Sequence, residues 1–183
     1  MCYIERSEAE GELQVMETVH PRQTPVEDQE SAYLRLEGMG TLGDTYAYHD
    51  GEVVNVFGGI PGELVVAKIF RYRRRRQRFI SGLVTEVIES SSHRINPPCP
   101  YFGPCSGCQW QHMEYQYQLV LKRNAVLNQL NCYRSLTDVR VTSTIPCAQE
   151  WNYRNHARFT VRRQGSLGYV NRIARKFVKI QEC

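Results

Sequence analysis

Three cysteines that lie within ten residues constrain this chain of 183 residues more than any other feature of its sequence. Cys99, Cys105 and Cys108 form a C-x5-C-x2-C run with prolines and glycines between them. Turn-forming residues allow three thiols to point at one centre, where thiolates bind a soft metal or an iron–sulfur cluster. A tetrahedral zinc site and a cubane cluster each need four ligands. Cys183, the last residue of the chain, is the candidate for the fourth ligand.

The spacing of these cysteines leaves alternatives open. We expect a cytoplasmic protein, because the N-terminus has no apolar signal segment and no run of 18 apolar residues could cross a membrane. Disulfides are rare in that compartment. A zinc site remains possible, although zinc ribbons usually supply two C-x2-C pairs and this chain has one. Unliganded thiols are the third alternative. The isolated cysteines Cys2, Cys132 and Cys147 have no such partners and are interpreted as passive.

The charge of the chain is unevenly distributed. Residues 1–30 carry eight acidic and two basic residues, a net charge of −6, whereas the other 153 residues carry 21 basic and 11 acidic residues, a net charge of +10. We predict that residues 1–30 form a disordered acidic tail. A body this basic indicates a polyanionic partner, most often nucleic acid, with solubility alone as the alternative.

Residues 31–91 predict a small antiparallel β-barrel. Asp50-Gly51 lies between two β-rich runs and predicts a hairpin, because both central residues of a type I′ turn need positive φ. Short runs with no helix between them fit a barrel whose curved face can hold nucleic acid. The strand candidates are Tyr33–Leu36, Tyr46–His49, Val53–Phe57, Leu64–Phe70 and Phe79–Ile88.

The connection between the last two of these strands is a second candidate site, because six of its eight residues are arginine. Guanidinium groups bind phosphate oxygens through a planar fork of donors, and a tyrosine beside them offers a surface for base stacking. A solvated basic loop is the alternative. The predicted RNA-binding residues are Arg71, Tyr72, Arg73, Arg74, Arg75, Arg76 and Arg78.

Residues 92–183 predict a cysteine segment, one helix and a second set of strands. An apolar stripe over Gln111–Leu130 predicts a helix that packs on a neighbouring sheet. Alternating residues predict antiparallel strands at Val139–Thr142, His156–Arg163, Leu167–Val170 and Lys176–Ile180. The fold class is therefore mainly β with a helix, of the α+β type.

Several of these motifs occur in the same order in one known family. They are Gly38 to Gly40, Asp50-Gly51, Pro61 to Glu63, Ser90 to Arg94, the cysteine run through His112, Tyr153-Arg154, Ala157 to Phe159, Leu167 to Tyr169, and Cys183. Residues 33–183 thereby resemble the N-terminal part of bacterial S-adenosylmethionine-dependent RNA (uracil-C5)-methyltransferases, nearest the branch that modifies large-subunit ribosomal RNA. Ser106, where that family usually has glycine, and a slightly long stretch at Gly38–His49 depart from its pattern.

The resemblance implies a TRAM barrel, a small RNA-binding β-barrel, at residues 31–91. It also implies a four-iron four-sulfur cluster on Cys99, Cys105, Cys108 and Cys183, within a partial central domain at residues 92–183. The partner it implies is RNA, and ribosomal RNA in particular, with neither a membrane nor an obligate protein partner. Catalysis and S-adenosylmethionine binding belong to a Rossmann-like domain of the full-length family enzyme, and the chain has no glycine-rich cofactor motif. We therefore expect this chain alone to be inactive.

Two other functions are weighed against this one. A stand-alone TRAM-type RNA-binding module would need no catalytic domain at all. Radical S-adenosylmethionine enzymes need a C-x3-C-x2-C motif and carry such a barrel last, whereas this chain has C-x5-C-x2-C and the barrel first.

Overall fold

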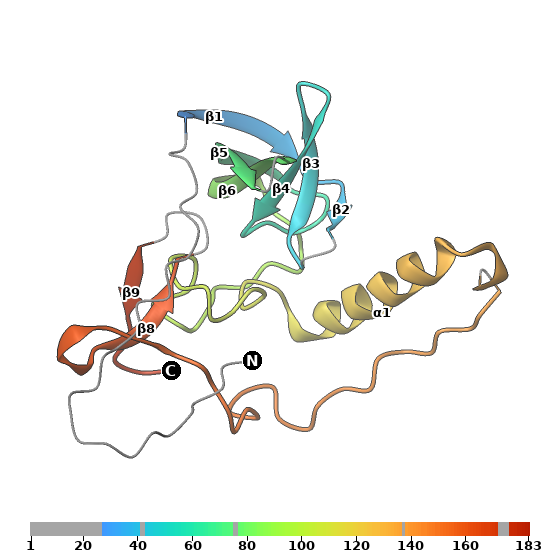
Figure 1. Cartoon of the computed structure of the whole chain (residues 1–183). Coiled ribbons are helices and arrows are strands. Elements are labelled where there is room, and N and C mark those ends of the chain that lie inside the picture. Colours follow the sequence, from blue (N-terminus) through green and yellow to red (C-terminus); the bar gives the residue numbers. More distant parts are fainter. Residues whose placement is uncertain (1–26, 41–42, 75–76, 137, 172–175) are drawn as a thin grey trace, which may run out of the picture.

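The computed structural model describes residues 27–40, 43–74, 77–136, 138–171 and 176–183, and contains two sheets joined by a cysteine-rich loop and one helix (Figure 1). A curled six-stranded sheet comes first, in the strand order β1-β5-β6-β4-β3-β2. Its strands are β1 (Glu27–Arg35), β2 (Gly38–Met39), β3 (Thr45–His49), β4 (Glu52–Phe57), β5 (Leu64–Arg74) and β6 (Gln77–Glu89). Residues 1–26 of the expected acidic tail lie outside the described residues, and residues 27–30 begin β1.

The core of this sheet follows from the two-residue period of its strands. Ala32, Leu34 and Leu36 are buried while the residues between them are exposed, as expected where one face of a strand meets a core. The side chains of the core cluster are Ala32, Leu34, Leu36, Ala47, Val54, Val56, Val65, Ala67, Ile69 and Ile80. Their burial supports the curl of the sheet into a half-barrel.

The predicted hairpin at Asp50-Gly51 is confirmed. It joins β3 to β4, and both turn residues have positive φ, 51° at Asp50 and 78° at Gly51. Glycine adopts this conformation freely and aspartate tolerates it, which is why this dipeptide marks the turn in the sequence.

The expectation of a purely antiparallel barrel needs correction. β4 pairs with β6 in parallel over three residues, while β6 pairs with β5 in antiparallel fashion. The connection of residues 58–63 carries the chain past β4, so that β6 rather than β5 lies beside it. The sheet is therefore mixed, with β1 and β2 at its two edges.

The segment after β6 is anchored to the sheet, although its serines and prolines gave it the composition of a linker. The Arg94 guanidinium donates from Nε and Nη2 to the two carboxylate oxygens of Glu63, at 2.7 Å each, and also to the Gly58 carbonyl at 2.8 Å. The Glu63 side chain is fully buried. It also accepts hydrogen bonds from the backbone N–H groups of Ser91 and Ile60. This network fixes where the chain leaves the sheet.

A second pair of contacts holds the end of the cysteine loop against the sheet. The buried His112 contacts the Gly59 carbonyl through Nε2 at 3.1 Å, and the Trp110 indole N–H donates to the Gly43 carbonyl at 2.6 Å. Met113 packs with Ile60 in a small second core. The cysteine loop is thus tied to the sheet at both of its ends.

The helix α1 (Tyr115–Asn131) corrects the prediction that an apolar stripe packs on a sheet. Only Leu119 and Leu121 are buried, whereas Val120 and Val126, which the stripe included, are about half exposed. Figure 1 shows α1 projecting away from both sheets. Leu121 packs with Ile60 and Met113 at the sheet end of the helix, and this contact sets its direction.

The chain after the helix forms fewer strands than its alternation predicts. After the short 3-10 helix η1 (Arg134–Leu136), the segment of residues 139–147 is not a strand. It is tied instead to α1, because Arg123 donates to the Val141 carbonyl, Thr144 to the Leu119 carbonyl, and the Cys147 N–H to the Tyr115 hydroxyl. A second sheet, in the order β7-β8-β9, comprises β7 (Thr160–Val161), β8 (Leu167–Val170) and β9 (Phe177–Lys179), with η2 (Arg163–Gly165) in the β7–β8 turn.

Among the described residues, no helix has both the length and the apolar character that crossing a membrane requires.

Candidate functional site

The cysteine loop is a series of tight turns. The N–H of Phe102 donates to the Cys99 carbonyl at 3.1 Å, and the N–H of Cys105 donates to the Tyr101 carbonyl at 2.9 Å. Gly103 lies between them with φ of 92°, a conformation that favours glycine. These turns fold the chain back on itself between the first and second cysteines.

The C-terminal sheet is hydrogen-bonded directly to this loop. The Ser106 hydroxyl donates to the Val170 carbonyl at 2.7 Å, and the Asn171 amide donates to the Pro104 carbonyl at 2.7 Å. Near the end of the chain, the Gln181 N–H donates to the Tyr101 hydroxyl at 3.3 Å. Residues separated by 64 to 80 positions in the sequence therefore lie side by side, and the terminal segment that carries Cys183 is held against the loop.

Cys105 lies within electrostatic reach of the other three candidate ligands. Burial raises the pKa of its thiol, and negative charge on Cys108, Cys99 and Cys183 raises that pKa further. The N–H of Gly107 donates to the Cys105 sulfur at 3.3 Å, and this hydrogen bond lowers the pKa of the thiol. Cys105 therefore lies close enough to the other three cysteines for their negative charge to disfavour its ionisation.

Tyr169 on β8 covers this neighbourhood. Burial raises the pKa of its hydroxyl, with smaller contributions from negative charge on Cys183, Cys105 and Cys108. A Cβ on Gly107 would lie 3.0 Å from the Tyr169 ring, so glycine permits the close approach. No local pattern in the sequence marks Tyr169 as a member of the site. Only the tertiary contact between β8 and the loop reveals it.

The spacing of the sulfur atoms bears on the size of the group they can hold. Zinc–sulfur bonds of about 2.3 Å in a tetrahedron place neighbouring sulfur atoms about 3.8 Å apart. Among the described residues, which include all four candidate ligands, no three cysteine sulfur atoms lie within 4.8 Å of one another. The arrangement is wider than a single zinc ion requires.

A pocket lies between the cysteine loop and the curled sheet. Phe57 and Leu83 line it from the sheet, and Phe102, Cys105 and Cys108 line it from the loop. His112 lines it as well, and burial lowers the pKa of its imidazole. The histidine is therefore neutral near pH 7 and holds the loop to the Gly59 carbonyl.

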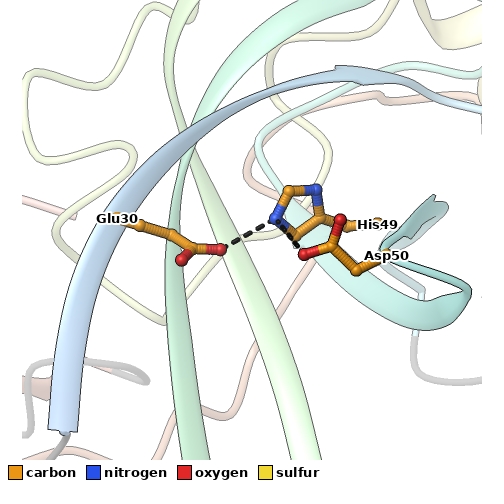
Figure 2. Close-up of side chains that lie close together, drawn as sticks. All are labelled: Glu30, His49 and Asp50. Carbon is orange, nitrogen blue, oxygen red and sulfur yellow. Dashed lines mark hydrogen bonds and ion pairs between the residues drawn. The ribbon is translucent and has the colours of Figure 1, made fainter.

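The structure also groups three polar side chains at the edge of the curled sheet (Figure 2). His49 Nε2 lies 2.8 Å from a carboxylate oxygen of Glu30 and 3.6 Å from one of Asp50. Arg71 donates to the same oxygen of Glu30 at 3.1 Å. Hydrogen bonds from Arg71 and His49 lower the pKa of the Glu30 carboxyl. Glu30, His49 and Asp50 have side chains of the kinds that bind metal ions. Because the Arg71 guanidinium already neutralises the Glu30 carboxylate, we interpret the group as an ion-pair network between β1, β3 and β5.

The arginine-rich segment forms the end of the β5–β6 hairpin, as its position predicted. Arg73 pairs with Arg78 and Arg74 with Gln77 in the backbone register. Arg78 is exposed, and Tyr72 stacks on Phe79 with ring centroids 5.6 Å apart. Arg71 is engaged by Glu30. Arg75 and Arg76, and the side chains of Arg73 and Arg74, lie outside the described residues.

The remaining cysteines lie apart from the candidate centre. Cys132 and Cys147 are free and exposed at opposite ends of the segment that follows α1, and Cys2 lies outside the described residues.

Comparisons with known proteins connect this arrangement to RNA modification. No family model matches the chain. An uncharacterized RNA methyltransferase of Listeria monocytogenes is 32% identical over 167 residues, which is 88% of this chain and 36% of the relative. Proteins named in the same way from Halalkalibacterium halodurans and Aquifex aeolicus are 32% and 33% identical over 88% and 82% of this chain, and 35% and 34% of their own lengths.

The chain is homologous to part of proteins named RNA methyltransferases. It spans about a third of the length of these relatives. Because the match covers 88% of this chain, it includes most of both sheets and the loop between them. It covers only part of the relative.

Proposed function

We propose that this chain is the RNA-binding and cluster-holding part of an S-adenosylmethionine-dependent RNA (uracil-C5)-methyltransferase that acts on ribosomal RNA. The observation that carries the proposal is the identity of 32% over 88% of the chain to proteins named RNA methyltransferases. The cysteine spacing and the order of the motifs favour the uracil-C5 branch within that class. The curled sheet would act as the TRAM-type barrel of such an enzyme.

The donor set fits a four-iron four-sulfur cluster on Cys99, Cys105, Cys108 and Cys183. Negative charge on the other three cysteines raises the pKa of the Cys105 thiol, and a cationic inorganic core would offset this effect because it binds thiolates. The sulfur spacing exceeds that of a zinc site, and a backbone N–H already donates to one sulfur, as is common around clusters. When bound, such a cluster would serve here as a structural crosslink between the loop and the C-terminal sheet.

The arginine hairpin supports contact with the phosphate backbone. Arg78 is exposed at its base, and the hairpin extends beyond the core of the curled sheet. Phosphate oxygens would neutralise the mutual repulsion of six arginines in eight residues. Arg71 has a different role, because Glu30 holds it in the sheet. We therefore assign phosphate binding to Arg73, Arg74, Arg75, Arg76 and Arg78.

The methyl transfer itself would belong to a further domain of the whole enzyme. In that enzyme, the hairpin would hold the RNA backbone while the target uracil is flipped out of its stack into the catalytic pocket. Binding of RNA by this part would supply orientation rather than chemistry. We accordingly expect no methylation by this chain alone.

Metal analysis tests the cluster. We expect purification without oxygen to yield about four irons and four sulfides per chain and a brown visible absorption. Cys183→Ser should lose most of the iron, whereas Cys132→Ser, which changes another exposed free cysteine, should retain it. Stoichiometric zinc without sulfide, or iron retained equally in both variants, would contradict the cluster assignment.

Titration with RNA tests the hairpin. We expect affinity for a ribosomal RNA stem–loop to fall steeply between about 50 and about 200 mM salt, because phosphate contacts release counterions. Substitution of Arg73 to Arg76 by alanine should weaken binding and flatten the salt dependence. Lys122→Ala with Arg140→Ala, two exposed cations outside the hairpin, is the control. Equal binding by the wild type and the hairpin variant would remove the hairpin from the interface.

A further inference from the structure

The stretch from Trp151 to Gln181, which includes the second sheet, has a composition that the proposed hairpin contact leaves unexplained. From Trp151 to Gln181 the sequence contains eight arginine and lysine residues and no aspartate or glutamate. Four of these cations lie in residues 151–163, which we call the basic strip. A stretch of 31 residues that carries +8 creates a local positive potential that no acidic side chain within it offsets.

The basic strip is exposed and has few partners. Residues 151–158 are all exposed, and the one hydrogen bond that ties any of the described residues 148–158 runs from Arg154 to the neighbouring Tyr153. Figure 1 shows the stretch from η1 to β7 as an extended trace along the lower edge of the molecule. Its backbone groups are therefore accessible to a ligand.

Large aromatic rings lie among these cations. Trp151 is 48% exposed and Tyr153 is 61% exposed. Asn152 between them has φ of 56°, so the chain bends at this point, and asparagine adopts that conformation at modest cost. The Arg154 guanidinium lies over the Tyr153 ring, 5.8 Å from its centroid. These two partly exposed rings offer flat faces among the cations, on which a ligand can stack.

We propose that the basic strip is a second RNA-contact surface, which binds unpaired nucleotides by stacking bases on Trp151 and Tyr153 while arginines neutralise their phosphates. This inference rests on the proposed function in so far as RNA is the partner, but it depends on different residues from the arginine hairpin. Single-stranded RNA fits the strip better than duplex RNA, because only unpaired bases expose their faces for stacking. Arg154 would add a cation–π contact on the Tyr153 ring.

The strip lies near the cysteine loop rather than on the curled sheet. Phe159, near its end, packs against Tyr169 with ring centroids 5.2 Å apart, and Tyr169 covers the candidate cysteine centre. Arg162 lies over the Phe177 ring at 5.5 Å. The two proposed contacts are thus on separate elements, the hairpin for backbone phosphates and the strip for unpaired bases.

Fluorescence anisotropy with two RNA probes tests the inference. One probe is a labelled single strand of about ten nucleotides, and the other is a duplex of the same composition. We expect Trp151→Ala with Tyr153→Ala to weaken single-strand binding about tenfold or more, because base–aromatic stacking contributes this much per ring. Duplex binding should change by less than about twofold, since it depends on phosphates.

Two further variants make the test specific. Trp151→Phe with Tyr153→Phe keeps aromatic rings and should restore most of the single-strand affinity. Tyr133→Ala removes a tyrosine that is 62% exposed, closely matched to Tyr153 at 61%, but lies outside the strip. It should bind both probes as the wild type does.

The outcomes separate the two proposals. A strip variant that binds the single strand like the wild type overturns the inference, even if the hairpin variant loses RNA. A strip variant that loses the single strand while the hairpin variant binds normally supports the inference and overturns the hairpin. Absence of RNA binding by the wild type overturns both. If light scattering shows that strip substitutions change self-association and leave RNA binding intact, the rings are covered by protein and the inference fails.

Discussion

The two parts of this molecule are stabilised in different ways. Of the fifteen apolar residues buried among the described residues, the curled sheet and its turns, up to β6, contain twelve and residues 92–183 contain three. Conversely, ten of the fourteen large apolar residues exposed among the described residues lie in residues 92–183. The first part therefore has a core of its own, whereas within the second part the C-terminal sheet is held to the cysteine loop by hydrogen bonds.

This difference indicates a division of roles. A sheet that buries its own apolar face keeps its shape without a ligand. The second part has too little buried apolar surface to fix its conformation alone. A crosslink through four thiolates and contacts with RNA or further protein would supply the missing order. Substitutions at the junction, in the helix and in the cysteine loop test where this division lies.

The largest effect is expected at the buried ion pair that joins the two parts. Arg94→Ala leaves the fully buried carboxylate of Glu63 without its guanidinium, which should cost about 3–5 kcal/mol of unfolding free energy. Arg35→Ala breaks an ion pair whose side chains are 49% and 58% exposed and should cost about 0–1 kcal/mol. Urea denaturation measures both. Similar values for the two variants would show that Arg94 does not anchor the cysteine loop.

The next effect concerns the contact of the helix with the sheet. Leu121→Ala removes a buried side chain that packs with Ile60 and Met113, and should cost about 2–4 kcal/mol. Val120→Ala, one residue away but half exposed, should change stability by about 0.5 kcal/mol or less. Thermal denaturation of the two variants compares them. If Val120 proves the costlier substitution, the expected apolar stripe rather than the observed end contact governs packing of the helix.

Acidification should weaken the junction between the two parts. Burial lowers the folded-state pKa of His112 below its ordinary value near 6.5, so the unfolded state takes up a proton first as the pH falls. The contribution of neutral His112 to the free energy of unfolding is complete above about pH 6.5. It decreases below that pH by at most about 1.4 kcal/mol per pH unit, because one proton is involved. Between about pH 7.5 and about pH 5.5, the stability of the wild type should fall more steeply than that of His112→Gln, which lacks the titrating imidazole. Parallel curves would exclude His112 as the cause.

Glu63 acts in a lower pH window. Burial alone would raise the pKa of its carboxyl, but hydrogen bonds from Arg94 and from two backbone N–H groups outweigh this and hold that pKa below 4.5. The stabilisation is complete above pH 4.5 and is lost as the pH falls through the lowered value.

The smallest effect is expected at the contact between Ser106 and β8. Ser106→Ala removes the donor to the Val170 carbonyl and should cost about 0.5–1.5 kcal/mol. Hydrogen exchange of β8 and β9 should become faster, and the iron of the proposed cluster should be released sooner to a chelator. Ser92→Ala, an exposed serine elsewhere on the chain, provides the control. Unchanged exchange in Ser106→Ala would show that the terminal segment is held by other contacts.

The sequence predicted the first part more fully than the second, and particular residues show why. The Asp50-Gly51 turn and the strands around it carry local signals, and each prediction was confirmed within a few residues. The stripe on the helix and the strand at Val139–Thr142 were wrong, because periodicity reveals an apolar face but not whether a partner covers it. The role of Arg94 was missed, since an arginine among serines and prolines resembles a linker until its buried partner is known.

By itself, the sequence determined the turns, most strands, the concentration of charge and the set of candidate thiols, because these depend on neighbouring residues and on composition. Only the tertiary structure decided that β6 lies between β4 and β5, that Glu63 holds Arg94, and that Tyr169 and the terminal segment cover the cysteine loop. The pairing of β4 with β6 joins residues 26 positions apart, and the other contacts join residues 31 to 80 positions apart. Their free energy comes from burial and hydrogen bonding that exist only after the chain has folded, so no local pattern records them.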